Sequence, residues 1–307
     1  MKLLLGLAAC LCLAQDDNIP TFRSEVSLVK VDLRITDRGG RDIAGLNKQD
    51  FIVFDESERR DIVNFASESE RDTVDVLLLL DVSGSMFQHL RELSSTTATA
   101  LEKLDRGARV ALMEFATRSQ VFQPFTTDFR LVERRITESI FKQTLGRDTL
   151  VNEALLAAAD YLQKSSQPRT RRFIVVVSDN AGTRLSVTDA QALRAVQSAN
   201  VVVNAIVVGQ QDDTVTPVRY TDPSASRFPD LNRYAQATGG TFVNASHVSD
   251  ALRAAIGEIR TRYQLHYAAP VSNPGKYRRI RVELAPEAKR RHPEAVIAAR
   301  EGYYAAQ

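Results

Sequence analysis

Oxygen-bearing side chains are concentrated in one short stretch of the chain, residues 81–85, which read Asp-Val-Ser-Gly-Ser. The stretch follows residues 76–80, an apolar run that is typical of a buried strand. A carboxylate and two hydroxyls at alternate positions of a tight turn can point toward one centre. Such hard oxygen donors suit a hard divalent cation such as Mg²⁺. The stretch therefore predicts a metal site that contains Asp81, Ser83 and Ser85.

Strands and helices alternate around this stretch, from about residue 73 to residue 264. The expected strands are residues 74–80, 110–115, 173–177, 201–208 and 241–243, with a short edge strand at 121–125. The expected helices are residues 89–104, 131–141, 150–162, 190–198, 231–238 and 251–263. Short apolar strands without polar alternation are buried on both faces, as in a parallel sheet covered by helices. The pattern predicts a doubly wound α/β domain with a mostly parallel sheet. In such sheets ligands bind outside the carboxyl ends of the strands, where Asp81 lies.

Two segments with a period of two flank the α/β region. In residues 22–70, apolar positions such as Val29 and Val31 alternate with charged ones, and the same period returns in residues 265–307. Each segment is too small to bury a core alone. We therefore expect the two to pack together into a small β-sandwich-like unit, with the α/β domain of residues 73–264 inserted between them.

Residues 81–85, in this setting, resemble the opening of the metal-ion-dependent adhesion site of the von Willebrand factor type A (vWA) family, which reads Asp-x-Ser-x-Ser. Residues 146–155 resemble the family's segment in which a threonine precedes a helix, and residues 173–179 resemble its buried strand that ends in an acid. The resemblance implies Thr149 as a hydroxyl ligand and Asp179 as a second carboxylate, bound directly or through a water.

The chain departs from the family pattern next to both of these positions. Asn180 stands where the family usually has glycine, and asparagine tolerates the left-handed backbone of such a turn. Asp148 stands where a glycine often precedes the threonine. We interpret Asp148 as a solvated loop residue, since aspartate is usually exposed.

The resemblance extends to the flanking β segments and covers nearly the whole chain after the leader. The segments that carry it are residues 37–54, 238–242, 262–267 and 299–304. They are similar to the exported bacterial VWFA-related family, known mainly from acidobacterial genomes. That family brings no established enzymatic activity and no established ligand.

The implied ligand set combines two carboxylates, Asp81 and Asp179, with the hydroxyls of Ser83, Ser85 and Thr149. Such a shell leaves a divalent ion with a coordination position to fill, and Mg²⁺ readily keeps waters there. A glutamate or aspartate of a partner protein can displace one of those waters. We therefore expect a protein-binding module that uses Mg²⁺, with Mn²⁺ and Ca²⁺ as alternatives, and that is not an enzyme.

The N-terminus predicts export. Lys2 precedes an apolar run that ends at Ala14, which is too short to span a bilayer as a helix. Cleavage after Ala14 would make residues 1–14 a signal peptide. A second option is a lipobox that makes Cys10 a lipidated residue and gives the protein its only membrane contact. We expect a periplasmic, outer-membrane-anchored or extracellular protein. Both cysteines lie in this leader, so the rest of the chain has no disulfide and no cysteine nucleophile.

Several other function classes lack their sequence signatures. The 40 basic and 38 acidic residues nearly balance, which gives no reason to expect a nucleic-acid partner. There is no Gly-x-Ser-x-Gly elbow, no dinucleotide-binding Gly-x-Gly-x-x-Gly after the first strand and no Walker sequence. The four histidines lack metal-ligand spacing, and His89 is expected on a helix surface.

Three alternatives remain open. Asp81 and its serines could form only a helix cap and turn, since aspartate and serine favour such positions. The protein could be a structural exported vWA scaffold that recruits nothing through a metal. A more remote option is a metal-assisted hydrolase, which would need a general base near the metal.

The basic residues 289–292 are interpreted as a solvated turn.

Overall fold

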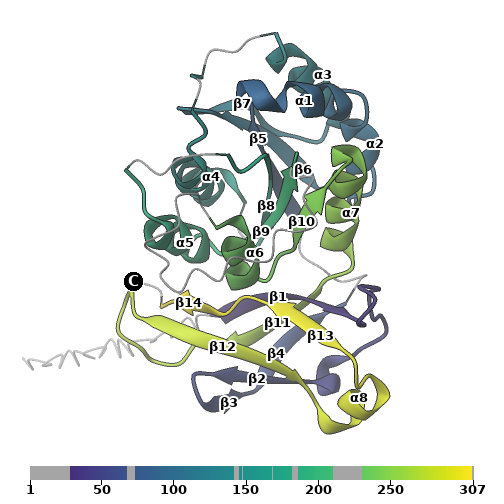
Figure 1. Ribbon diagram of the computed structural model, residues 1–307. Coiled ribbons are helices and arrows are strands. Elements are labelled where there is room, and N and C mark those ends of the chain that lie inside the picture. The colour runs from purple at the N-terminus through teal and green to yellow at the C-terminus, as the bar shows by residue number, and fades with distance from the viewer. Residues whose placement is uncertain are drawn as a thin grey trace, which may run out of the picture.

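The alternating middle of the chain forms one six-stranded sheet with helices on both faces (Figure 1). The computed structural model describes residues 28–67, 73–141, 145–146, 148–167, 169–181, 186–209 and 230–305. The strand order is β10-β9-β8-β5-β6-β7, and all neighbours pair in parallel except β6 and β7. The strands are β5 (Val74–Asp81), β6 (Arg109–Phe115), β7 (Ser119–Thr126), β8 (Arg171–Ser178), β9 (Val201–Val208) and β10 (Phe242–Ala245).

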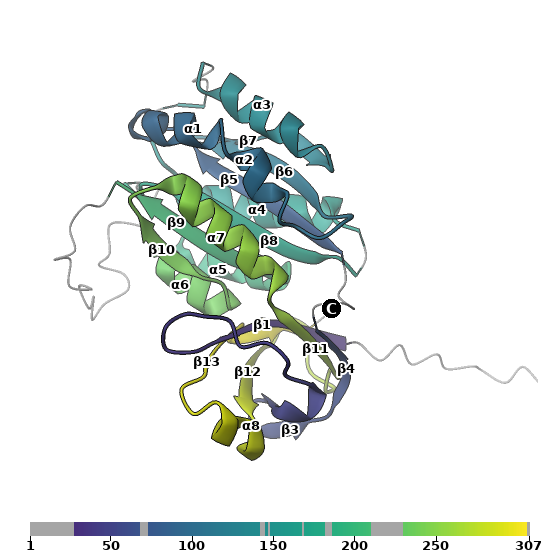
Figure 2. The ribbon, with the colours of Figure 1, turned by 90° about the vertical axis from the view of Figure 1, so that its right-hand side faces the viewer.

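The helices divide between the two faces of this sheet (Figure 2). On one face lie α1 (Phe87–Leu93), α2 (Thr97–Leu101), α3 (Phe129–Ser139) and α7 (Val248–Arg260). On the other lie α4 (Val151–Ser165), α5 (Asp189–Ser198) and α6 (Leu231–Thr238). Every residue of β5 is buried, because helices cover both sides of it. The doubly wound α/β fold that the pattern predicts is confirmed.

The strands that follow β5 along the chain are added to the sheet first on one side of β5 and then on its other side. The next strand, β6, pairs on one side of β5, whereas β8 pairs on the other. This arrangement makes the carboxyl end of β5 the topological switch point, the position at which doubly wound sheets bind ligands. Asp81 is the last residue of β5 and therefore lies there.

The segments before and after the α/β region form two four-stranded antiparallel sheets. One has the order β13-β1-β11-β4 and the other β14-β12-β2-β3, so each contains strands from both ends of the chain. The strands are β1 (Leu28–Thr36), β2 (Phe51–Asp55), β3 (Glu58–Arg60), β4 (Ile62–Ala66), β11 (Tyr263–Ala268), β12 (Tyr277–Leu284), β13 (Val296–Ala299) and β14 (Gly302–Tyr304). Alternate residues of β1 are buried, as its period of two predicts.

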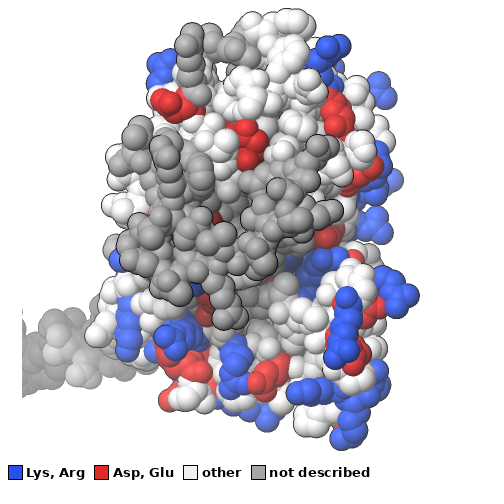
Figure 3. Space-filling view, viewed as in Figure 1, with Lys and Arg blue, Asp and Glu red and all other residues white. Residues whose placement is uncertain are grey.

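One buried carboxylate joins strands of both terminal segments. Asp55 of β2 is fully buried, and its Oδ2 accepts hydrogen bonds from the hydroxyls of Tyr267 (2.9 Å) and Tyr303 (2.8 Å). Its Oδ1 accepts a hydrogen bond from Nε of Arg278 at 2.6 Å. Aspartate is rarely buried without such partners. On the face shown in Figure 3, the lysines and arginines of this β unit are interspersed with acidic side chains.

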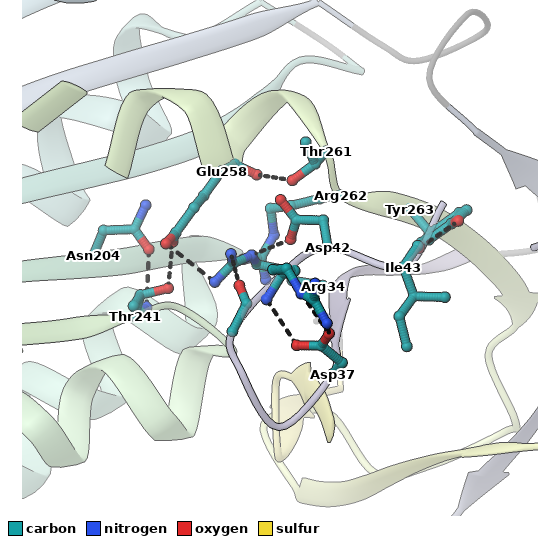
Figure 4. A network of polar contacts seen from close by, with 12 residues as sticks. Arg34, Asp37, Asp42, Ile43, Asn204, Thr241, Glu258, Thr261, Arg262 and Tyr263 are labelled. Carbon is teal, nitrogen blue, oxygen red and sulfur yellow. Dashed lines mark hydrogen bonds and ion pairs between the residues drawn. The ribbon is translucent and has the colours of Figure 1, made fainter. Parts of the chain in front are cut away.

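Largely buried ion pairs connect the β unit to the α/β domain. Asp32 of β1 accepts a hydrogen bond at 2.5 Å from Nε of Arg171, the first residue of β8. Glu258 of α7 forms an ion pair with Arg34 at 3.1 Å and accepts a hydrogen bond from the hydroxyl of Thr241 at 2.6 Å (Figure 4). The β unit therefore contacts the amino end of β8, roughly 23 Å along the strand from its carboxyl end.

Some expected elements differ in the structure. The single helix predicted over residues 89–104 is divided into α1 and α2, because the intervening hydroxyls bind backbone carbonyls. Ser94 Oγ donates to the Arg91 carbonyl, and both Ser95 Oγ and Thr96 Oγ1 donate to the Glu92 carbonyl.

Other differences lie near the end of the chain. The helix predicted over 251–263 runs from Val248 to Arg260, and Tyr263 already begins β11. The expected turn at residues 289–292 overlaps a short helix, α8 (Pro286–Arg291), whose first residue is the proline that favours a helix start. The last two strands of the chain, β13 and β14, belong to different sheets. No helix in the described part of the chain is long and apolar enough to cross a membrane.

Candidate metal centre

Asp81 is fully buried at the end of β5, and two hydrogen bonds fix its carboxylate. Its Oδ1 accepts from the backbone amide of Ser83 at 2.9 Å, and its Oδ2 accepts from the hydroxyl of Ser178 at 2.6 Å. Ser178 ends the neighbouring strand β8, so the second bond links the ends of two adjacent strands. The carboxylate is therefore held in one orientation at the switch point of the sheet.

The charge of Asp81 is poorly compensated. Burial raises the pKa of this carboxyl from 3.8 to about 6, and the hydrogen bonds from Ser178 and Ser83 only partly oppose that effect. The nearby charge of Asp179 raises the pKa further. Within the described residues, no lysine, arginine or histidine forms an ion pair with Asp81. A buried carboxylate without a counter-charge is costly, and a bound cation is one of the usual remedies.

Ser83 and Ser85 lie on the turn that follows Asp81. Their hydroxyl oxygens are 3.3 Å apart, and the turn continues as a 3₁₀ helix, η2 (Gly84–Met86). The Ser83 side chain makes no capping hydrogen bond to this helix, although Ser83 occupies the N-cap position. Ser83 is buried and Ser85 is exposed, so the pair extends from the carboxylate to the molecular surface.

A cavity of about 530 Å³ opens beside Ser85. It is lined by Gly84, Ser85, Phe87, Gln88 and His89. The ring of Phe87 is 40% exposed at the start of α1, so it could contact a bound molecule. The side chain of Ser85 is therefore accessible from outside the protein.

Thr149 reaches the same edge of the sheet from the next loop. The amide of Leu150 donates to the carbonyl of Ala116 at 3.0 Å, and Ala116 follows the end of β6 directly. The end of β6 is adjacent to Asp81, whose Cα is paired with that of Phe115. Thr149 is buried, and its hydroxyl makes no hydrogen bond within the described residues. The oxygen itself is not one of the fully buried, unpaired side-chain atoms, so it is accessible to solvent or to a ligand.

A close backbone approach shapes the Thr149 loop. Gly146 has a φ of 104°, and a Cβ there would lie 2.3 Å from Oγ1 of Thr117. Asp148 is exposed, and its amide donates to the same hydroxyl at 3.0 Å. Its carboxylate also accepts a hydrogen bond from Thr117 at 3.3 Å. Asp148 therefore belongs to the loop and lies at the protein surface.

Asp179 directly follows β8 and lies beside Asp81, whose pKa its charge raises. Asn180 has a φ of 55°, the left-handed conformation that asparagine tolerates. This turn is held by two hydrogen bonds: the Asn180 amide donates to Ser178 Oγ at 2.9 Å, and the Ala181 amide donates to Asp179 Oδ1 at 3.0 Å.

The structure thus places all five predicted side chains at the carboxyl edge of neighbouring strands, and it adds Ser178. Ser178 is not one of the predicted ligands. Its position between a buried strand and an acid is the only indication of its role in the sequence. Among the described residues, no three side chains of His, Cys, Asp or Glu cluster together. The candidate site instead combines carboxylates with hydroxyls, a set of hard oxygen donors that fits Mg²⁺, Mn²⁺ or Ca²⁺.

The part of the chain that contains this site is similar to a known protein family. The family model described as the von Willebrand factor type A domain matches residues 75–233, which include all five side chains. No curated protein matches the chain.

The leader, including Cys10 and Ala14, lies outside the described residues.

Three solved structures are similar to the chain. An aerotolerance-related membrane protein from Bacteroides fragilis is 20% identical, with a TM-score of 0.45, over 61% of this chain and 98% of that one. BatB from Bacteroides thetaiotaomicron is 21% identical, with a TM-score of 0.43, over 61% and 97%. Proximal thread matrix protein 1 from the mussel byssus is 10% identical, with a TM-score of 0.48, over 67% and 51%.

Proposed function

The chain belongs to the von Willebrand factor type A domain family, and from this premise we propose that it is an exported module that binds a partner protein through a divalent cation. The cation would be held by Asp81, Ser83, Ser85, Thr149 and Asp179. Domains of this family commonly mediate protein–protein interaction. The partner would present an aspartate or a glutamate at the site.

The observation that supports this proposal best is the environment of Asp81. Its carboxylate is fully buried and has no cationic partner among the described residues, and its two hydrogen bonds leave lone pairs available. A helix cap alone would place the aspartate side chain on a helix amide. Asp81 does accept the Ser83 amide in an Asx turn, but that turn uses only one lone pair of Oδ1. Here Asp81 is the last residue of a strand, and Ser83 makes no capping hydrogen bond.

Each side chain would have a distinct task. Asp81 supplies the buried negative charge, and Thr149 offers a hydroxyl without a hydrogen-bond partner in the described part of the chain. Ser83 and Ser85 extend the donor set toward solvent, where the exposed Ser85 borders the cavity. When bound, a divalent ion supplies the positive charge that attracts a carboxylate of the partner. The two carboxylates of the set would balance the charge of a divalent ion without filling its coordination shell, so that a position stays open for the partner's carboxylate.

Export and membrane attachment form part of the proposal. The residues that predict them, Lys2 to Ala14, lie outside the described ones. Mass spectrometry of the mature protein tests both options, because cleavage after Ala14 and lipidation of Cys10 give different N-termini and masses. A chain that keeps its first residue in the mature form would contradict export by this leader.

The experiment that tests the function has two arms. Calorimetric titration of the purified protein with MnCl₂ and MgCl₂ should show uptake, which the Asp81→Ala variant should lose. The exposed Asp160→Ala change on α4 is the control, and it should leave uptake intact. In the second arm, the immobilised protein should retain its partner from an envelope fraction, and EDTA should release it. Retention in EDTA, or by the Asp81→Ala variant, would instead indicate a scaffold without metal-mediated recruitment.

A further inference from the structure

The first turn of α4, just after Thr149, is hydrogen-bonded to the end of the loop that begins at Asp179. Oε1 of Glu153 accepts hydrogen bonds from the amide of Ser186 at 3.0 Å, from its hydroxyl at 3.1 Å and from the amide of Val187 at 3.2 Å. These two amides immediately precede α5, whose N-cap is Thr188. One carboxylate oxygen therefore holds the end of the loop in place.

Asn152 makes a second connection between the same two segments. Its Nδ2 donates to the carbonyl of Val187 at 3.0 Å and to Oδ1 of Asp189 at 2.8 Å. Its Oδ1 accepts from the hydroxyl of Tyr234 at 2.7 Å. Both Asn152 and Tyr234 are buried, so these polar groups satisfy one another away from water.

We propose that Asn152 and Glu153 are positioning residues that set where Asp179 lies relative to Thr149. The inference rests on the proposed function, because it concerns the same metal site. Thr149 precedes both side chains by only a few residues at the start of α4, and the residues that they bind, Ser186 and Val187, follow Asp179 along the chain. Neither residue touches Asp81, Ser83 or Ser85 in any contact within the described part of the chain.

The chemistry of the two side chains suits this role. Burial by itself raises the pKa of Glu153, but the hydrogen bonds from Ser186 and Val187 outweigh it and bring the pKa below its ordinary value. The side chain is therefore an anion at neutral pH, and charge-assisted hydrogen bonds are stronger than neutral ones. The side-chain amide of Asn152 donates to the Val187 carbonyl and the Asp189 carboxylate and accepts from the Tyr234 hydroxyl, so both of its ends are paired.

Outer groups of this kind strongly affect the affinity of a metal site, since ligands must be held in place before the ion binds. The Glu153→Ala variant removes the acceptor of the three hydrogen bonds. We expect it to weaken Mn²⁺ binding about tenfold or more in calorimetry. The Glu153→Gln variant keeps an acceptor oxygen and loses only the charge, so its affinity should stay within about threefold of the wild-type value.

Two further variants keep the test decisive. Tyr234→Phe removes only the hydroxyl that orients Asn152, and it should weaken Mn²⁺ binding by a smaller factor even if Glu153→Ala fails to fold. Asp160→Ala, on the exposed side of the same helix, is the control and should bind as the wild type does. Hydrogen exchange of the metal-free proteins should be faster at the Ser186 and Val187 amides in Glu153→Ala only.

The outcomes separate the inference from the proposed function. If the wild type takes up Mn²⁺ and both Glu153→Ala and Tyr234→Phe bind it equally well, the positioning role is wrong and the function stands. The role is also wrong if Glu153→Gln loses as much affinity as Glu153→Ala, since the acceptor geometry would then not matter. If the wild type takes up no metal, the proposed function fails and the positioning role fails with it.

Discussion

Asp75 and Asp81 lie at opposite ends of strand β5, both buried, and their electrostatic surroundings are opposite. Asp75 accepts two hydrogen bonds from the guanidinium of Arg109, at 2.9 and 2.6 Å. Asp81 has only neutral donors, Ser83 and Ser178, within the described residues. One strand thus contains a carboxylate that the protein neutralises itself and another that has no cationic partner among the described residues.

This contrast predicts opposite effects of one substitution at the two positions. In EDTA at about pH 7.5, Asp81→Asn should raise the free energy of unfolding by an amount on the order of 2 kcal/mol, because it removes a buried charge whose pKa is raised from 3.8 to about 6. Asp75→Asn should lower it by about 1–3 kcal/mol, because Arg109 loses its partner. Urea unfolding measures both. A loss of stability in Asp81→Asn would mean that the native protein already compensates that charge.

The raised pKa of Asp81 also predicts how the metal-free protein responds to pH. The folded state holds this proton more tightly than the unfolded state, where the pKa is near 3.8. The contribution of Asp81 to stability is therefore fully present below about pH 3.8 and is lost as the pH rises through about 6. The free energy of unfolding, measured in EDTA at several pH values, should show this loss in the wild type. The Asp81→Asn variant should not show it, which would assign the loss to Asp81.

Metal affinity should change in the opposite direction over the same pH range. A metal ligand must be deprotonated, so Mn²⁺ binding should strengthen as the pH rises through about 6 and then level off. Calorimetry at constant ionic strength measures the change, together with the protons that binding releases. An affinity that is constant from about pH 5 to about pH 8 would show that Asp81 is not the titrating ligand.

Ser178 provides a test of the groups around the ligands. Its hydroxyl donates to Asp81 at 2.6 Å and lowers the pKa of that carboxyl, so Ser178→Ala should raise this pKa further. It should also weaken Mn²⁺ binding about tenfold, because one oxygen of Asp81 loses its fixed direction. Ser139→Ala is the matched control, since the Ser139 hydroxyl is also buried but donates to the Ile136 carbonyl on α3. Equal affinities in the two variants would contradict the role of Ser178.

The sequence was informative where local pattern and local chemistry agree. The uninterrupted apolar run before Asp81 predicts a central parallel strand, and its end at an acid places that acid at the ligand-binding edge. The two-residue period of β1 likewise predicts its buried face. These features depend on residues that are neighbours along the chain.

Features that depend on distant or competing contacts could not be predicted. The break after α1 arises because the Ser94, Ser95 and Thr96 hydroxyls bind backbone carbonyls that a continuous helix would use, although the apolar spacing continues across it. The hydrogen bond between Glu153 and Ser186 joins the first turn of α4 to the residues before α5, and these are close only because α4 and α5 pack side by side on the sheet.

The contact between the two units of the protein yields the last prediction. Arg171 is almost completely buried, and Asp32 is its only ion-pair partner in the described part of the chain. Asp32 also favours the charge of the buried Arg262, whose pKa burial lowers to about 10. Asp32→Ala would leave Arg171 without its ion-pair partner and would remove one of the charges that favour Arg262, and breaking a buried pair in this way costs about 3–5 kcal/mol.

A second substitution separates charge from packing at this contact. Adding Arg171→Met to Asp32→Ala removes one stranded cation and should recover part of the lost free energy of unfolding. Breaking the exposed pair of Asp160 and Lys164 should change it by no more than about 0.5 kcal/mol. Urea unfolding of the four proteins gives the comparison. If Asp32→Ala costs no more than the exposed control, water must reach the contact between β1 and β8, and the two units would then be held together chiefly by their apolar contacts and the chain connections.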